Sequence, residues 1–203
     1  MAPKYKVTYF NLMALGEPIR YILSQGGVEF EDDRIEKEEW PTHKKDTPYG
    51  QMPVLEVEGK KAHQSTSICR YLGKEFGLAG ENNWESLQID ATADTLVDLR
   101  IAIKDALRAD EATKVQKKEK LMKETIPFYL TRLDKQVEEN GGYFVNKKLS
   151  WADLYFAAFA EVCIGILETD FVADYPNLKS LVDKVWNLPN IKTWRAKRPK
   201  TSK

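Results

Sequence analysis

The segment at residues 47–67, TPYGQMPVLEVEGKKAHQSTS, constrains the fold more than any other part of the chain. A proline donates no hydrogen bond to a sheet, so Pro53 belongs at the first residue or the edge of the apolar strand that Val54 begins. The Met52-Pro53 bond is therefore a candidate for the cis form. If it is cis, the Met52 N–H and C=O are free to pair with the backbone of a ligand. The segment predicts a docking edge for a peptide.

A helix begins at Ser65, directly after the second strand of this segment. The unpaired N–H groups and positive dipole end of a helix N-terminus favour a carboxylate, and the Gln64 amide and Ser65 hydroxyl can add donors. Taken singly, a strand-initial proline is usually structural, and a serine at a helix start is usually a cap. Their proximity indicates a site that pairs with a peptide backbone and holds a carboxylate.

These motifs resemble a known family. PYGQMPVLEVEG followed by HQSTSICRYLGKEFGLAG is similar to the glutathione-binding domain of cytosolic glutathione transferases. The similarity is greatest to the sigma class, which includes invertebrate transferases and the vertebrate glutathione-dependent prostaglandin D synthase. The resemblance covers nearly the whole chain. It implies a thioredoxin-like α/β domain at residues 1–78, a linker at 79–83, and an all-α domain at 84–203 that carries the acceptor site and dimer contacts.

The order of secondary-structure patterns agrees with the α/β domain. The expected elements are a central strand at 5–10, a helix from Glu17 to Gly26, a strand at 30–35 parallel to the first, a polar connection that contains Trp40, a hairpin of strands at 54–57 and 61–63, and a helix at 65–76. No cysteine follows the first strand, where a thiol redox enzyme of this fold carries a Cys pair. Thioredoxin and glutaredoxin activities are therefore excluded.

Only helical patterns occur beyond residue 84. Apolar residues at helical spacing predict two long amphipathic helices side by side, through residues 89–103 and 121–137, the second bent at Pro127. Two shorter helices are expected at 177–186 and 191–196.

A capping box is the clearest helix start in the chain. Ser150 can cap the N–H of Asp153 while the Asp153 carboxylate reaches back, and an apolar helix follows from residue 151 to about residue 166. This helix is expected to form the core of the second domain.

The charge balance and the few cysteines and histidines exclude several classes of function. Lys plus Arg and Asp plus Glu number 31 each, so no strong attraction to nucleic acid or anionic membranes is expected. Cys69 and Cys163 are expected to be buried free thiols, and His43 and His63 lie in separate contexts, so no metal site is expected. The polar N-terminus and the absence of an apolar run of about 18 residues favour a cytoplasmic protein.

Thiol activation requires a hydrogen-bond donor beside the sulfur. A free cysteine thiol has a pKa of about 8.5, and lowering it by about 2 units, or about 2.7 kcal/mol, makes the thiolate the majority form at pH 7. A neutral phenol can supply this donor. From the sequence alone, Tyr9 is a strand tyrosine that packs, and Tyr5 competes with it. The resemblance assigns the catalytic role to Tyr9, because YKVTYF matches the start of sigma-class proteins.

The resemblance also implies the other glutathione contacts. These are Trp40 and Lys44 at the glycyl end, Gln51, Met52 and Pro53 along the peptide, and Gln64 and Ser65 at the γ-glutamyl end. In a homodimer, Asp98 of one subunit is implied to contact the γ-glutamyl ammonium of the glutathione bound to the other. Considered alone, Trp40 would be a core residue and Asp98 a solvated carboxylate.

Phe10, Met13 and Leu15 are implied as walls of the acceptor site. Vertebrate prostaglandin D synthases carry an arginine at the position of Leu15, so this chain lacks a positive charge there and a more apolar pocket is expected. Tyr49 matches an aromatic residue that inserts into the partner subunit of the dimer. The alternative for Tyr49 is a turn tyrosine that packs on its own domain.

The predicted function is a transferase that conjugates glutathione to small hydrophobic electrophiles, with reduction of organic hydroperoxides as an added activity. The presence of Tyr9, Gln64 and Ser65 favours this enzyme. Two alternatives remain open: glutathione-dependent isomerisation of prostaglandin H2, and a non-catalytic role like that of lens crystallins on this scaffold. In each, glutathione is a co-substrate or ligand, and no permanently bound cofactor is implied.

Overall fold

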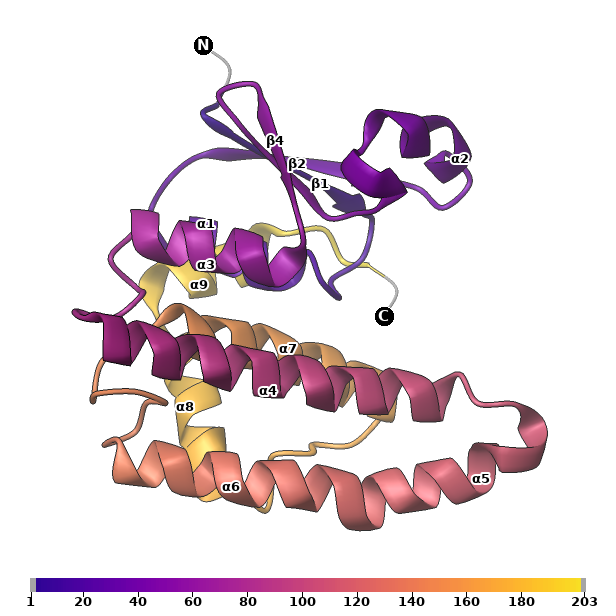
Figure 1. Cartoon of the computed structure of the whole chain (residues 1–203), viewed down its shortest axis with the longest axis vertical. Helices are drawn as coiled ribbons and strands as arrows, with labels where there is room; N and C mark the ends of the chain where they lie inside the picture. The colour runs from indigo at the N-terminus through magenta and orange to yellow at the C-terminus, as the bar shows by residue number, and fades with distance from the viewer. Residues whose placement is uncertain (1–2, 202–203) are drawn as a thin grey trace.

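A mixed four-stranded sheet forms the first part of the molecule (Figure 1). The computed structural model describes residues 3–201, so the outermost residues of both predicted domains, 1–2 and 202–203, lie outside the described part. The strands are β1 (Tyr5–Phe10), β2 (Phe30–Ile35), β3 (Val54–Val57) and β4 (Lys60–His63). Their order is β2-β1-β3-β4, which confirms the central position of β1. β1 runs parallel to β2 and antiparallel to β3, which pairs antiparallel with β4.

Alternation along β1 sets the two faces of the sheet. Tyr5, Val7 and Tyr9 are buried, and the residues between them are half-buried. The buried face is covered by α1 (Glu17–Gln25) and α3 (Ser65–Glu75), as Figure 1 shows. The phenol of Tyr9 therefore projects toward the helices and the second half of the molecule.

The β3–β4 hairpin and the bond before it have the predicted form. Glu58 and Gly59 both adopt positive φ, 50° and 82°, so they make a two-residue turn. Lys60 consequently pairs with Val57, and β4 begins one residue earlier than expected. The Met52-Pro53 bond is cis.

The connection between β2 and β3 is more regular than the sequence indicated. It contains α2 (Trp40–His43) and two short 3-10 turns, η1 (Lys44–Asp46) and η2 (Pro48–Gly50). Parts of this segment face the side of the sheet that carries Lys6 and Thr8.

The rest of the described chain is helical. Its elements are α4 (Asn83–Leu107), α5 (Glu111–Lys120), the π-helical turn η3 (Leu121–Thr125), α6 (Ile126–Glu139), α7 (Trp151–Leu167), α8 (Pro176–Trp186) and α9 (Pro189–Lys197). α4 and α6 lie side by side, as predicted, with Gln136 Nε2 donating to Thr92 Oγ1 at 2.9 Å (Figure 1). The irregularity expected at Pro127 is the π turn directly before it, because proline supplies no N–H to a regular helical ladder.

α7 is the central helix of the molecule. The predicted capping box is present: the Ser150 N–H and hydroxyl both donate to Asp153 Oδ2 at 2.7 Å. The N–H of Phe144 donates to the other carboxylate oxygen at 2.9 Å, which fixes the preceding loop to the start of α7. The first ten residues of α7 are buried, and the helix packs against α1, α4 and α8. A single apolar core thus runs through the sheet region and the helical region.

Candidate active site

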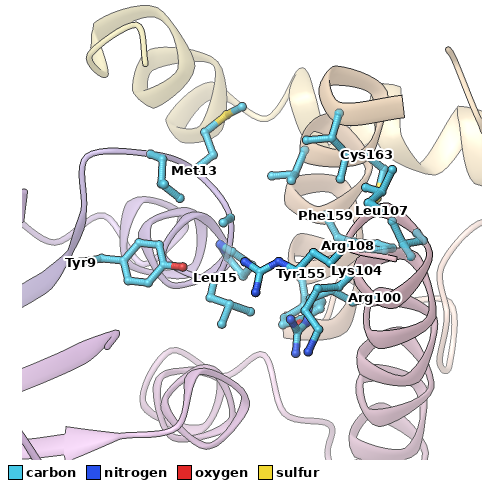
Figure 2. A pocket seen from close by; sticks show the side chains of 16 residues that line it. Tyr9, Met13, Leu15, Arg100, Lys104, Leu107, Arg108, Tyr155, Phe159 and Cys163 are labelled. Carbon is cyan, nitrogen blue, oxygen red and sulfur yellow. The ribbon is translucent and has the colours of Figure 1, made fainter. Parts of the chain in front are cut away.

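Tyr9 lies at the end of β1 with its ring against the start of α1. A Cβ atom at Gly16 would lie 2.6 Å from a carbon of the Tyr9 ring, so only glycine leaves room for the ring. Tyr9 is 6% exposed, and Figure 2 shows its hydroxyl pointing across a cavity toward α4 and α7. The strand and Gly16 together aim the phenol at this cavity.

The surroundings of Tyr9 keep its phenol neutral. Burial raises the pKa of Tyr9 above its ordinary value of 10.0, while the Leu15 backbone N–H and the charges of Arg20 and Arg100 oppose this rise. Because the proton stays on the oxygen at neutral pH, the hydroxyl can donate a hydrogen bond to an anion in the cavity. This is the protonation state that stabilisation of a thiolate requires.

The predicted γ-glutamyl residues lie at an open helix N-terminus. Gln64 precedes α3 with φ 70° and ψ 103°, an unusual conformation for a residue with a side chain, and its side chain makes no cap. Such a conformation costs about 1–3 kcal/mol and is often retained at functional sites. Ser65 is the first residue of α3, whose leading N–H groups have no partner within the helix.

The peptide edge ends at Met52, which precedes the buried Pro53. Among residues 3–201, no hydrogen bond joins the Met52 N–H or C=O to another group. Gln51 is exposed beside it. These groups are available to a ligand backbone.

The predicted glycyl-end residues lie one helical turn apart, and Phe10 lies beside them. Trp40 begins α2, and the exposed Lys44 follows it. The aliphatic stem of Lys44 lies over Gly50, where an added Cβ atom would be 3.1 Å from the stem. Phe10 packs edge-on against both Trp40 and Tyr9, with ring centroids 5.6 and 5.7 Å apart. Phe10 is accordingly not among the residues that line the cavity in front of Tyr9.

The cavity has a volume of about 430 Å³ and lies between the loop after β1 and the helices α4 and α7. Met13 and Leu15, both proposed from the sequence as acceptor walls, line it. The other lining residues are Tyr9, Leu12, Ala14, Pro18, Arg100, Ile103, Lys104, Leu107, Arg108, Tyr155, Phe159, Val162, Cys163 and Ile166. Residues from both halves of the chain therefore build one site.

The sequence reasoning missed the α4 wall, where Arg100 and Lys104 lie on the helix and Arg108 directly follows it. The pocket was expected to be more apolar because Leu15 replaces an arginine, yet three cations enter it from the opposite side. Their spacing of four residues on one long helix was the available signal, because residues at this spacing share a face.

Comparison with known proteins identifies the family. The model of the glutathione S-transferase N-terminal domain matches residues 5–74, and that of the C-terminal domain matches residues 97–198. The chain belongs to the glutathione S-transferase family. A glutathione S-transferase of Anopheles gambiae is 48% identical over 98% of both chains. The hematopoietic prostaglandin D synthase of Gallus gallus is 37% identical, over 98% of this chain and 99% of that one.

Solved structures of the glutathione S-transferase family agree with the fold. The structure of prostaglandin synthase D of Nilaparvata lugens has a TM-score of 0.94 and 53% sequence identity, and covers 98% of this chain and 100% of that chain. The glutathione S-transferase of Ascaris lumbricoides has a TM-score of 0.86 and 40% sequence identity, and covers 99% of this chain and 100% of that chain. The thioredoxin-like domain followed by an all-α domain is thus confirmed. Similarity to both transferases and prostaglandin D synthases is the combination expected of the sigma class.

Two predicted residues of this glutathione S-transferase face away from the cavity. Tyr49 is 84% exposed, and its ring contacts only the His63 ring among the aromatic pairs of the described chain, at 4.7 Å. Asp98 is exposed on α4 and is not a lining residue. Both positions suit contacts outside the subunit, and their roles remain predictions.

Within residues 3–201, no helix has the length and apolar character needed to cross a bilayer. The same residues contain no group of three or more His, Cys, Asp and Glu side chains placed to hold a metal ion.

Proposed function

We propose that this protein is a glutathione transferase in which Tyr9 stabilises the glutathione thiolate for attack on small hydrophobic electrophiles. The observation that supports this most directly is the neutral, buried phenol of Tyr9 at the mouth of a largely apolar cavity lined by both halves of the chain. The match of both family models supports the same activity.

In the proposed reaction, the Tyr9 hydroxyl donates a hydrogen bond to the sulfur and lowers the thiol pKa, so the thiol proton is lost to solvent. The thiolate then forms the C–S bond. With an aryl halide, the halide ion leaves. With an unsaturated aldehyde, the α-carbon takes a proton from water after the addition. Tyr9 keeps its own proton throughout.

Glutathione is the co-substrate in this proposal, and the first domain holds it. Trp40 and Lys44 would bind the glycyl carboxylate, and the backbone at Met52 would pair with the peptide. Gln64 and Ser65, with the free N–H groups of α3, would bind the γ-glutamyl carboxylate. Asp98 of a second copy would meet the γ-glutamyl ammonium. We accordingly propose a homodimer, and a cytoplasmic location by analogy with the family.

A second candidate function is isomerisation of prostaglandin H2. It is favoured by the 53% identity to a protein described as prostaglandin synthase D of Nilaparvata lugens. Leu15 distinguishes this chain from the vertebrate synthases, so the activity has to be tested directly.

The decisive experiment compares wild type with Tyr9→Phe on an aryl halide, a lipid aldehyde, an organic hydroperoxide and prostaglandin H2. Loss of one preorganised donor is expected to lower kcat by about 10²–10³, with glutathione affinity nearly unchanged. The pKa of the bound thiol, measured from thiolate absorbance against pH, should rise toward the free value.

Unchanged turnover in Tyr9→Phe would refute the role of Tyr9. Retention of wild type on immobilised glutathione without conversion of any of the four substrates would instead favour the non-catalytic role. Formation of prostaglandin D2 at rates above the other conversions would favour the isomerase.

A further inference from the structure

Three cationic side chains form a row along the α4 wall of the Tyr9 cavity. All three line the cavity: Arg100 and Lys104 lie on one face of α4, because residues four apart share a face, and Arg108, the residue directly after α4, continues the row. At a rise of 1.5 Å per residue, the row extends about 12 Å along the helix. Figure 2 shows guanidinium groups from α4 reaching into the space across from the Tyr9 hydroxyl.

The protein itself neutralises this row only weakly. Lys104 has one ion pair, to Asp105 at 3.7 Å, and the Asp105 side chain is 64% exposed. Within residues 3–201, neither Arg100 nor Arg108 forms a side-chain ion pair with a carboxylate, and Nε of Arg100 is buried without a hydrogen-bond partner. Of the residues that line the cavity in the described part of the chain, none is Asp or Glu.

Hydroxyl groups near the row do not compensate its charge. Burial raises the pKa of Tyr155, whereas the charge and hydrogen bonding of Arg100 act in the opposite direction. Burial likewise raises the pKa of Tyr9, and the charge of Arg100 opposes this rise. Both phenols therefore stay neutral at physiological pH, and the row keeps its net positive charge.

The remaining walls of the cavity are apolar. Leu12, Met13 and Leu15 lie on one side, and Phe159 and Ile166 lie on α7. Arg100 is half-buried, and a partly buried cation is costly unless it is paired with an anion, whereas Lys104 and Arg108 are exposed and can meet a ligand from solvent. The cavity therefore suits a ligand with an apolar body and a negative charge at one end.

We propose that the preferred acceptors are amphiphilic electrophiles that carry a carboxylate. This inference rests on the proposed transferase function. The α4 row binds the carboxylate, while the electrophilic carbon meets the glutathione sulfur at Tyr9. For an unsaturated carbonyl acid, the sulfur bonds to the β-carbon, the alkene electrons move onto the carbonyl, and the α-carbon takes a proton from water. The carboxylate is unchanged and serves only to position the substrate.

The test uses one electrophile in two forms: a medium-chain enone acid and its methyl ester. Only the acid carries a charge, so the ratio of their kcat/KM values reports the contribution of the row. Charged hydrogen bonds contribute about 1.5–3 kcal/mol, and wild type should therefore prefer the acid by about tenfold or more. Arg100→Gln, Lys104→Gln and Arg108→Gln should each lower this ratio, and the triple variant should bring it to about one.

Controls separate charge from shape and from folding. Arg108→Lys keeps the charge and should keep most of the preference. Lys118→Gln removes an exposed charge on α5, outside the cavity, and should leave the ratio at its wild-type value. The far-UV circular dichroism spectrum and the Tm of each variant show whether it is folded. The KM for glutathione shows whether the row instead serves the tripeptide.

Equal use of acid and ester by wild type, or an acid preference that survives in the triple variant, overturns the proposal. A binding measurement distinguishes failure of the proposed anion site from failure of the proposed transferase function. Calorimetry with the saturated acid and its ester, in the presence of S-methylglutathione, needs no turnover. Tighter binding of the saturated acid, together with no conversion of the enone acid or the aryl halide, would support the anion site and contradict the transferase activity. Equal binding of the saturated acid and ester would contradict the anion site.

Discussion

At the scale of single residues, the placement of Tyr9 depends on Gly16. A methyl group at Gly16 would lie 2.6 Å from the Tyr9 ring, so the ring must move in Gly16→Ala. A shift of about 1 Å in a catalytic group can cost about 10²-fold in rate. We expect kcat with an aryl halide to fall at least about tenfold, with glutathione affinity nearly unchanged.

The double variant Gly16→Ala with Tyr9→Phe is the control for this prediction. If Gly16 acts through Tyr9, the double variant is no slower than Tyr9→Phe alone, because the hydroxyl is already gone. Additive losses would show that Gly16 affects the enzyme by another route.

The Cys163 thiol lines the acceptor cavity but is expected to be unreactive. Burial raises the pKa of Cys163 well above its ordinary value, and the same holds for Cys69. The thiol form is a poor nucleophile, so an electrophile in the cavity should react with glutathione and leave the protein unmodified. Intact mass after iodoacetamide treatment at pH 7 should show no label on the native protein and two labels after denaturation. A label on native Cys163 would contradict this.

The residues that sequence predicts well are those with local signals. A proline before an apolar strand marks Met52-Pro53 as a candidate for the cis form that the structure has, and the free N-terminus of α3 follows from its helix start. The sequence did not predict that Arg108 lines the cavity or that Phe10 does not. Whether their side chains enter the cavity depends on packing against α2 and across α4 and α7, which no local pattern encodes.

At the scale of elements, the start of α7 depends on Asp153. Its carboxylate accepts from the Ser150 N–H and hydroxyl and from the Phe144 N–H. Asp153→Asn places an NH₂ group or a neutral oxygen before these donors, and loss of such a cap costs about 0.5–2 kcal/mol. We expect urea unfolding at fixed protein concentration to show a loss of this size at pH 7.

The Asp153 carboxylate also makes the stability difference between wild type and Asp153→Asn depend on pH. Burial raises the pKa of Asp153 from 3.8 to about 6, against the opposing effect of its hydrogen bonds. Between these pH values, the folded state keeps a proton that the unfolded chain releases, so the free energy of unfolding falls as pH rises. Asn does not titrate, so the stability advantage of wild type over Asp153→Asn should narrow from pH 4 to pH 6.

The control is Asp183→Asn, which removes one exposed charge on α8 and so measures the general effect of charge on stability. An advantage that widens as pH rises would mean that the fold favours the ionised carboxylate, contrary to the expectation.

Elements with strong caps and periodicity were predictable from sequence, and irregular ones were not. β1, the hairpin and α7 carry alternation, turn residues or a capping box, so their positions agree within a residue or two. The α2 segment lacks such signals and is set by packing on the sheet. Pro127 does predict an irregularity in its helix, because proline has no N–H, but not the π form of the turn before it.

At the scale of the whole molecule, partly buried ion pairs join the end of the chain to its beginning. Arg198 donates to Glu17 Oε1 and to Glu161 Oε1, both at 2.6 Å, and the indole N–H of Trp194 donates to Glu17 at 2.8 Å. These contacts hold α9 against α1 and α7, two elements that form walls of the acceptor cavity. Partners separated by 181 positions leave no pattern in the sequence, so this network could not be predicted.

The proposed dimer gives the last prediction. Tyr49 is 84% exposed with φ 53°, an arrangement that presents an aromatic ring outward from a turn. Truncation of a central aromatic anchor typically costs an interface about 2 kcal/mol or more. Tyr49→Ala should therefore dissociate to monomers at concentrations where wild type and Tyr49→Phe remain dimeric by analytical ultracentrifugation. A fully dimeric Tyr49→Ala would contradict the proposed role of Tyr49 as an aromatic anchor in the dimer interface.

Asp98 provides an independent test of the same assembly. If it binds the glutathione of the partner subunit, Asp98→Asn should weaken glutathione binding in the dimer, because the γ-glutamyl ammonium loses its counter-charge. In monomeric Tyr49→Ala, the partner's carboxylate is already absent, so adding Asp98→Asn should change the affinity no further. Calorimetric titration of the four proteins completes this double-mutant cycle. An equal loss of affinity in the monomer would mean that Asp98 acts within its own subunit, and the shared site would then be wrong even if the dimer exists.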